Sequence, residues 1–348
     1  MQFLKTWTLP VAIVLGTTLY LTFYWVPQLD DLGDRLSPVM DTLFPIMVFL
    51  TLFITFCKVD FHQMRPHRWH IGVLVAQLLL VAVIVVPLLP CSSGRLGDWL
   101  FSRLGLFSFN GPLGSLGTFA TNGTQECSTF NVPILLEAVL TCIIGPSAAA
   151  APVVVGKLGG NISTMTTYTL LSSVASALLI PLVFPLLEQT VHVQFLTAFL
   201  IILQKVATVL LLPLALGWVV QHYWPSLCRF VTSMPNLSFY TWAVSLSITT
   251  GITVKNIVHS AAPLSLLCAI AVATFVLCFV QFAIGRSIGR WLGEEINAGQ
   301  ALFQKNTALS IWVSYMYLNP VASIGAGCYV LWQNIVNSLE LYQHDKRK

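Results

Sequence analysis

The sequence predicts an all-α polytopic membrane protein with ten transmembrane helices. Of its 348 residues, 56% are hydrophobic and only 9% are charged. The apolar runs are long enough to cross about 30 Å of hydrocarbon, which takes about 20 helical residues. These runs cover residues 7–26, 41–57, 69–90, 131–158, 163–187, 194–220, 237–254, 262–285, 295–316 and 320–340.

The first run, from Trp7 to Val26, has spanning length and no small-residue cleavage site after it. It therefore predicts a permanent helix and not a cleaved signal peptide.

An even number of spans places both termini on the same side of the membrane, and the basic residues indicate which side. With both termini in the cytoplasm, eleven basic residues lie inside: Lys5, Lys58, Arg65, Arg68, Lys157, Arg229, Arg286, Arg290, Lys346, Arg347 and Lys348. Only Arg35, Arg95, Arg103 and Lys255 then lie outside. Cytoplasmic loops carry the excess of basic residues, so we expect cytoplasmic termini and a multi-pass protein of the plasma membrane, which in a bacterium is the inner membrane.

One long polar loop, residues 91–130, connects the third and fourth spans on the outside. It contains Cys91 and Cys127, and a disulfide between them in an oxidising compartment is a hypothesis that the sequence leaves open. The other six cysteines lie in or beside apolar spans without CxxC spacing, so they are read as small hydrophobic residues. We expect no bound metal and no cofactor.

Two of the ten spans are interrupted, the fourth and the ninth. The fourth contains Pro146 and Pro152, and the ninth is polar from Glu294 to Ser310 with Lys305 near its middle. With five spans in each half, residues 1–190 and 191–348 form two repeats of inverted orientation, and the interruptions occupy corresponding places. Interrupted helices at matching positions of inverted repeats indicate the binding site of a transporter.

A proline removes an amide donor and frees backbone groups that lipid cannot satisfy. Those groups must face a cavity or a partner, and the amino ends of half-helices then attract anions. The alternative is a proline kink in a packed bundle.

Lys305 and Lys205 both lie inside spans. A charge near the bilayer midplane costs roughly 2.5–3.5 kcal/mol, so it must face protein or water. Lys305 is either a functional cation in a solute pathway or a lysine that reaches an interface or pairs with an acid such as Glu137. Lys205 either shares an anion site with Lys305 or faces a cleft merely because lipid would reject it.

Several residues in order along the chain resemble the bile acid:sodium symporter family over residues 7–340. They are Gln77, Gly145-Pro146 followed by small residues, Gly160-Asn161, Gln304, Pro320, Gln333 and Asn337. The resemblance implies a panel of helices 1, 2, 6 and 7 and a core of helices 3–5 and 8–10. It also implies that helices 4 and 9 cross at the membrane centre, with substrate between panel and core and two sodium ions behind the crossing.

The residues that the resemblance implies at the first sodium site are altered in this chain. Ala151 and Pro152 stand where the family has serine and asparagine at the crossing, and Met165 and Thr169 stand where it has serine and threonine on helix 5. No metal ligand set of the family is complete here.

The second half of the chain departs further from the family's pattern of sodium ligands. Gln300 replaces the family's sodium-binding glutamate four residues before Gln304, and Lys305 replaces an asparagine. Gln77, Thr169 and Gln304 keep the character of sodium ligands. Sodium prefers oxygen ligands, one of them anionic, and a nearby ammonium repels it by about 4 kcal/mol at 4 Å for an effective dielectric constant of 20. We expect no sodium coupling.

The sequence therefore predicts a secondary transporter of a small or amphipathic organic anion by alternating access. Lys305 would replace the ion at the crossing, either by exchanging protons or as a fixed charge. The site residues expected are Pro146, Ala151, Pro152, Gln300, Gln304, Lys305, Asn306, Thr307 and Lys205. The alternatives are ordinary sodium symport and a receptor that does not transport.

Other functional classes find no support in the sequence. The spans contain no GxSxG or HExxH pattern, so an enzyme is not expected. A net charge of +4 spread over short loops indicates no nucleic-acid partner. The expected partners are the organic anion and the lipid bilayer, and nothing in the sequence indicates an oligomeric state.

Overall fold

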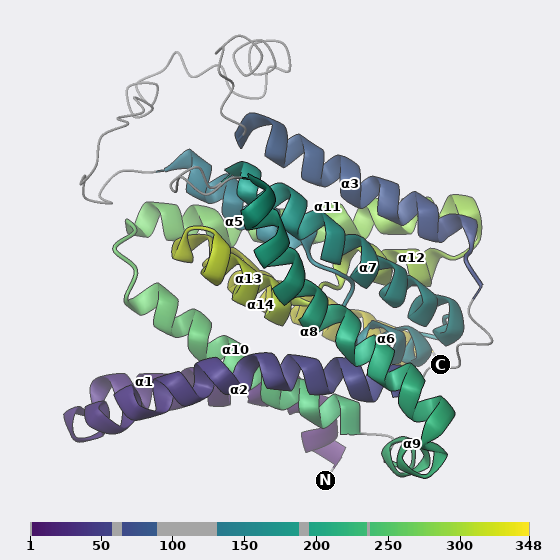
Figure 1. Cartoon of the computed structure of the whole chain (residues 1–348), viewed down its shortest axis with the longest axis horizontal. Coiled ribbons are helices and arrows are strands. Elements are labelled where there is room, and N and C mark those ends of the chain that lie inside the picture. Colours follow the sequence, from purple (N-terminus) through teal and green to yellow (C-terminus); the bar gives the residue numbers. More distant parts are fainter. Residues whose placement is uncertain (1, 58–64, 89–130, 188–194, 235–236, 348) are drawn as a thin grey trace.

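The computed structural model describes residues 2–57, 65–88, 131–187, 195–234 and 237–347, and the named elements in them are all helical (Figure 1). The long helices and half-helices are α1 (Gln2–Trp25), α2 (Asp30–Cys57), α3 (Arg68–Leu88), α5 (Val132–Ile144), α6 (Ala151–Lys157), α7 (Ile162–Leu187), α8 (Phe195–Tyr223), α10 (Leu237–Val258), α11 (Leu264–Leu292), α12 (Glu295–Phe303), α13 (Thr307–Tyr317) and α14 (Ser323–Arg347). The short ones are α9 (Pro225–Thr232), η1 (Pro27–Leu29) and η4 (Pro320–Ala322).

Each predicted apolar run contains helix, and the two predicted interruptions are confirmed. The fourth run is divided into α5 and α6, and the ninth into α12 and α13. The start of α2 was predicted at residue 41 but lies at Asp30. Hydropathy detects only the apolar part of a helix, and the first turns of α2 carry charged residues that a bilayer core would exclude.

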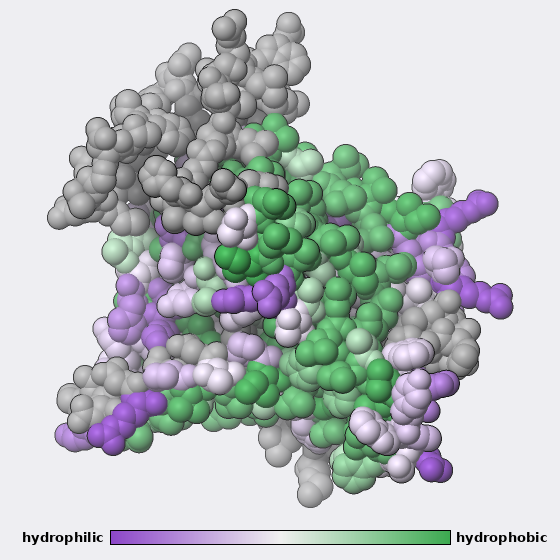
Figure 2. Space-filling model, viewed as in Figure 1, coloured by the Kyte–Doolittle hydropathy of each residue, from purple (hydrophilic) through white to green (hydrophobic). Residues whose placement is uncertain are grey.

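Among the described residues, five helices are long and apolar enough to cross a membrane, with apolar segments Pro38–Cys57, Arg68–Leu88, Ile162–Leu187, Phe199–Tyr223 and Leu264–Leu292. Large apolar side chains also cover the outer surface, such as Leu79 (62% exposed) and Val83 (65% exposed) on α3. Figure 2 shows hydrophobic residues over much of the middle of one face, with a small hydrophilic group at its centre, and further hydrophilic residues toward the edges. A surface of this kind suits hydrocarbon, so the chain is an all-α membrane protein.

The buried core brings together helices that are far apart in the sequence. Its largest apolar cluster includes Phe56 of α2, Leu140 of α5, Phe184 of α7, Val206 of α8 and Tyr329 of α14, each at most 1% exposed. The interrupted helices thus lie in the middle of the packed bundle and not at its surface.

The last helix, α14, is wedged between α5 and α10 through two glycines. A Cβ atom added to Gly325 would meet the backbone carbonyl of Ala138 on α5, and one added to Gly327 would meet Thr253 on α10. Close to these contacts, the Asn256 side chain on α10 donates a hydrogen bond of 2.9 Å to the hydroxyl of Ser323 at the start of α14. The missing side chains let three helices approach at this point, which holds α14 beside the interrupted α5.

Gly325→Ala should destabilise the folded protein by about 1–3 kcal/mol, because the backbone of α5 has to move to admit the methyl group. The matched control is Gly33→Ala in α2, where the nearest atom to an added Cβ lies 3.7 Å away. That change should be neutral or stabilise by about 0.5–1 kcal/mol. Heat-unfolding midpoints of the purified protein in detergent measure both, and equal midpoints for the two variants would contradict the close contact.

Candidate functional site

The two interrupted helices meet where their helical structure stops. Residues 145–150 separate α5 from α6, and residues 304–306 separate α12 from α13. The Ala148 amide donates to the Gln304 carbonyl and the Asn306 amide donates to the Pro146 carbonyl, both at 2.9 Å, in an antiparallel bridge between Ser147 and Lys305. Each break therefore satisfies backbone groups of the other, which the absence of water in a bilayer core demands.

Side chains from neighbouring helices fix this crossing. The Gln333 side chain on α14 forms two hydrogen bonds with the backbone of Lys305. Its Oε1 accepts from the Lys305 N–H at 3.0 Å, and its Nε2 donates to the Lys305 carbonyl at 3.3 Å. The Ser147 amide donates to the Ser172 hydroxyl on α7 at 3.0 Å. The crossing is thereby attached to helices from both halves of the chain.

The carboxyl end of α5 is completed by glutamines from two different helices. Gln77 on α3 donates through Nε2 to the carbonyls of Ile143 (3.0 Å) and Gly145 (3.1 Å), with a longer contact to Ile144. Gln281 on α11 donates to the carbonyl of Cys142 at 3.3 Å. The last carbonyls of a helix have no intrahelical partner, so these amides replace the water that a soluble protein would use.

The carboxyl end of α12 is completed in a similar way. The Tyr329 hydroxyl on α14 donates to the carbonyl of Phe303 at 2.7 Å and accepts from Gln281 at 2.9 Å. A single chain of hydrogen bonds therefore connects the ends of both half-helices.

Lys305 lies at the crossing with its side chain directed into a pocket. It is 1% exposed, and its Nζ has no hydrogen-bond or ion-pair partner among the described residues. The expected alternative, an ion pair with Glu137, is not formed. An ammonium with no partner inside a membrane protein is costly, so a ligand that neutralises it would be strongly favoured.

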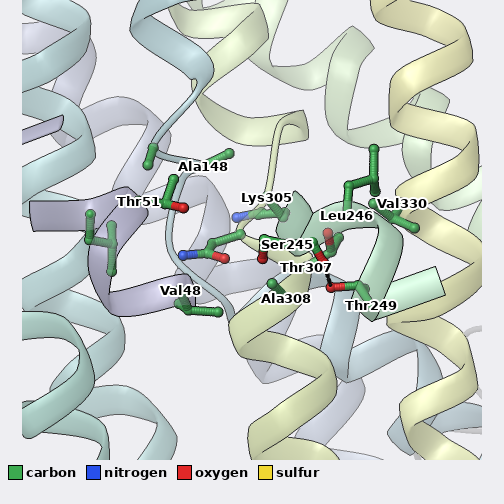
Figure 3. Close-up of a pocket in the computed structure, with 13 residues that line it drawn as sticks. Val48, Thr51, Ala148, Ser245, Leu246, Thr249, Lys305, Thr307, Ala308 and Val330 are labelled. Carbon is green, nitrogen blue, oxygen red and sulfur yellow. Dashed lines mark hydrogen bonds between the residues drawn. The ribbon is translucent and has the colours of Figure 1, made fainter. Parts of the chain in front are cut away.

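The pocket beside Lys305 has a cavity volume of about 30 Å³. The described residues that line it are Val48, Thr51 and Leu52 of α2, Ala148 and Ala149 of the first break, Ser245, Leu246 and Thr249 of α10, Lys305 and Asn306 of the second break, Thr307 and Ala308 of α13, and Val330 of α14. Figure 3 shows the Lys305 amino group pointing toward Thr51 and Ala148. The pocket thus lies between α2 and α10 on one side and the crossing on the other.

Three of the predicted site residues line this pocket, namely Lys305, Asn306 and Thr307. The Asn306 side chain accepts from the Leu309 amide at 3.3 Å and so caps the start of α13. Sequence reasoning missed the wall formed by Thr51, Ser245 and Thr249, although hydroxyl residues inside otherwise apolar spans were a usable signal.

Lys205 lies elsewhere, because it is exposed on α8 and is not among the pocket-lining residues. The structure does not bring Lys205 together with Lys305 in this pocket, and an anion site shared by the two lysines stays a prediction. Its exposed position on the helix surface is compatible with the simpler alternative, a lysine that faces a cleft merely because lipid would reject it.

The first crossing lies at Ser147, four residues before the predicted position at Ala151 and Pro152. Ala151 and Pro152 are instead the first two residues of α6, and both are buried. The fixed φ of a proline suits the first turn of a helix, so Pro152 begins a helix and does not interrupt one. The interruption comes from the preceding segment, which contains Pro146.

Several side-chain oxygens that could coordinate a cation remain at the positions where the resemblance implies sodium. The side-chain oxygens of Gln77, Gln300 and Gln304 are buried and have no hydrogen-bond partner in the described residues. The Thr169 hydroxyl donates to the Met165 carbonyl at 3.0 Å, and the Met165 side chain belongs to an apolar cluster. These residues offer neutral oxygens but no negative charge.

One carboxylate that sequence reasoning missed does reach this region. Glu340 on α14 accepts a hydrogen bond from the Gln300 side chain, and it also forms an ion pair with Arg286 on α11. The Glu340 side chain is 13% exposed and that of Arg286 is 31% exposed. Arg286 also pairs with Glu295, which in turn pairs with Arg290, so two arginines balance two carboxylates and the surroundings of Gln300 carry no net negative charge for a cation. The partners lie 40 and 54 residues from Glu340 in the sequence, so no local pattern indicates them.

Arg286→Met should destabilise the protein by about 2–3 kcal/mol, less than the 3–5 kcal/mol typical of a fully buried pair, because Arg286 is partly exposed. The double variant Arg286→Met/Glu340→Gln should recover most of the loss, since it leaves no unpaired charge. Heat-unfolding midpoints of the two variants and wild type measure this. A double variant as unstable as Arg286→Met alone would show that the pairing is not the source.

The predicted disulfide between Cys91 and Cys127 and the rest of the external loop lie outside the described residues. No group of three or more metal-binding side chains occurs in the part of the chain that the structure describes.

Comparison with known proteins identifies a family whose model matches more than half of the chain. Residues 45–260, more than half of the chain, match the family described as the Sodium Bile acid symporter family. The match begins in α2, includes the first interrupted helix and ends before α11, so Lys305 lies outside it. No curated protein matches the chain.

Proposed function

Because the chain belongs to the sodium bile acid symporter family, we propose that it is a secondary transporter that moves a small or amphipathic organic anion by alternating access. One observation carries the proposal: a buried lysine without a partner lines a pocket at the crossing of two interrupted helices. Amino ends of half-helices and a lysine together attract anions, and neither suits a cationic substrate.

We further propose that ten helices span the membrane in two inverted repeats, residues 1–190 and 191–348, with both termini in the cytoplasm of a plasma membrane. The positions of the interrupted helices and the excess of basic residues on the proposed cytoplasmic side support this topology. In this arrangement α1, α2, α8 and α10 form the panel, and the remaining long helices form the core. Substrate in the pocket touches α2 and α10 of the panel and the crossing of the core.

Transport in this proposal is not coupled to sodium, and Lys305 takes the place of the ion. Gln300 stands where the family's carboxylate would be, and the nearby Glu340 belongs to a group of ion pairs in which Arg286 and Arg290 balance Glu340 and Glu295. The neutral oxygens of Gln77, Gln300 and Gln304 favour a second candidate, ordinary sodium symport with rearranged ligands. Lys305 disfavours this second candidate, because it follows Gln304 directly in the sequence and its ammonium would repel a sodium ion bound there.

The heat stability of the purified protein in sodium and in potassium separates the two candidates. A ligand bound to the folded state stabilises it by RT ln(1 + [L]/Kd), so a working sodium site gives a sodium-specific rise. We expect equal midpoints in both salts. A strong sodium-specific rise would make the chain a conventional symporter.

Repeating the measurement at several pH values with wild type and Lys305→Asn tests the role of the lysine. A pH dependence that Lys305→Asn loses identifies proton exchange, whereas anion binding without pH dependence identifies a fixed charge. Uptake of small carboxylates into proteoliposomes separates a transporter from a receptor on the same fold.

A further inference from the structure

The pocket at the crossing offers hydrogen-bond acceptors as well as a positive charge. Thr51 on α2 donates its hydroxyl proton to the Met47 carbonyl at 2.8 Å, and Thr249 on α10 donates to the Ser245 carbonyl at 2.7 Å. A hydroxyl whose proton is already donated still has lone pairs and acts as an acceptor toward a ligand. Both residues line the pocket, and in Figure 3 they lie on opposite sides of Lys305.

The positive charge in this pocket has no counterpart of opposite sign. Lys305 provides the ammonium, and the described residues that line the pocket include no aspartate or glutamate. A carboxylate on the ligand is therefore attracted, whereas a ligand ammonium is repelled by Lys305 and finds no acidic partner. The donors that satisfy Thr51 and Thr249 should accordingly be neutral hydroxyls and not amines.

The size of the pocket sets a further limit. Its cavity volume in this structure is only about 30 Å³, close to the share of one molecule in liquid water, so a small ligand fits with the least displacement of the surrounding helices. Hydroxyl residues are contributed by α2, α10 and α13, so the polar lining is not confined to one wall. A bulky apolar ligand would leave the acceptor lone pairs of these buried hydroxyls without a donor.

We propose that this site selects a small hydroxy acid, with its carboxylate at Lys305 and its hydroxyl groups donating to Thr51 and Thr249. The inference rests on the proposed anion transport and narrows its substrate class. A site built to bind a hydroxyl rejects the analogue that lacks it, because its own acceptors are then left unpaired. Thr51 and Thr249 are the residues that determine this specificity.

Glycerate and propanoate test the proposal, because they share a carbon skeleton and differ in two hydroxyl groups. Their dissociation constants come from the stabilisation of the full-length purified protein against heat. We expect glycerate to bind wild type at least about tenfold more tightly, the effect of one or two hydrogen bonds. In Thr51→Val/Thr249→Val the ratio should fall to about twofold, since the methyl replaces only the hydroxyl.

The matched control is Thr250→Val, which should keep the wild-type ratio. Thr250 is buried on the same helix and donates to the Leu246 carbonyl at 2.8 Å, but it is not among the pocket-lining residues. This control separates loss of a pocket hydroxyl from a general effect on α10.

The inference is overturned if wild type binds the two acids equally, if the double variant keeps the discrimination, if serine binds better than glycerate, or if neither acid binds. Its failure is distinct from failure of the proposed function. Equal binding of both acids that Lys305→Met abolishes leaves anion transport standing without the hydroxyl selectivity. Binding that is indifferent to Lys305→Met removes both.

Discussion

Lys305→Met should make the folded protein more stable and at the same time almost abolish anion uptake. Methionine has a similar volume but no charge, so the folded state no longer carries a buried ammonium without a partner. The expected gain is roughly 2–3 kcal/mol, the cost of a lysine near the bilayer centre. Loss of one partner of a buried charge pair between protein and ligand costs about 2–5 kcal/mol of binding free energy. Without the Lys305 ammonium, anion uptake should therefore fall by about 100-fold or more.

The measurements are the heat-unfolding midpoint in detergent and the uptake of small carboxylates into proteoliposomes. Lys205→Met is the matched control, because Lys205 is an exposed lysine in a span and does not line the pocket. It should leave both quantities close to wild type. A Lys305→Met protein that is less stable would show that the ammonium has a stabilising partner, and one that transports normally would remove Lys305 from the site.

Gln77→Leu should destabilise the protein by about 2–4 kcal/mol and impair transport. The change leaves the carbonyls of Ile143 and Gly145 without their side-chain donor, and each buried group left unpaired costs about 1–3 kcal/mol. The carbonyl of Ile144 keeps a hydrogen bond of 2.9 Å from Ser176. Because Gly145 leads directly into the crossing, the loss should also disturb the position of Ser147 opposite Lys305.

Heat-unfolding midpoints and uptake again provide the readout. Gln204→Leu, at an exposed glutamine on α8, is the control and should change stability by less than about 0.5 kcal/mol. If both variants are equally stable, the carbonyls at the end of α5 find other donors and the role assigned to Gln77 is wrong.

The sequence was sufficient to locate the helices and both interruptions. Long apolar runs identify helices by composition alone, and Pro146 and the polar stretch around Lys305 are incompatible with an unbroken apolar helix. A charge away from water is costly, so Lys305 could be predicted as a functional residue from its place inside an apolar run alone.

The register of the crossing and the contacts that support it could not be predicted from the sequence. Which residue faces Lys305 depends on where α6 begins, and a proline is compatible with either a break or a first helical turn. The hydrogen bonds from Gln333 and the ion pair of Glu340 depend on how α14 packs, which no local pattern specifies. Lys205 resembled Lys305 in the sequence, and only packing distinguishes a buried lysine from an exposed one.

The mutual completion of the two breaks has a consequence for biosynthesis. The carbonyl of Pro146 obtains its partner from Asn306 and the amide of Ala148 from Gln304, residues that follow 160 and 156 positions later in the sequence. While the ribosome is still producing the second half, the first interrupted helix sits in the membrane with open backbone groups. The nascent chain must therefore shelter that segment until α12 and α13 arrive, and neither half is a complete folding unit by itself.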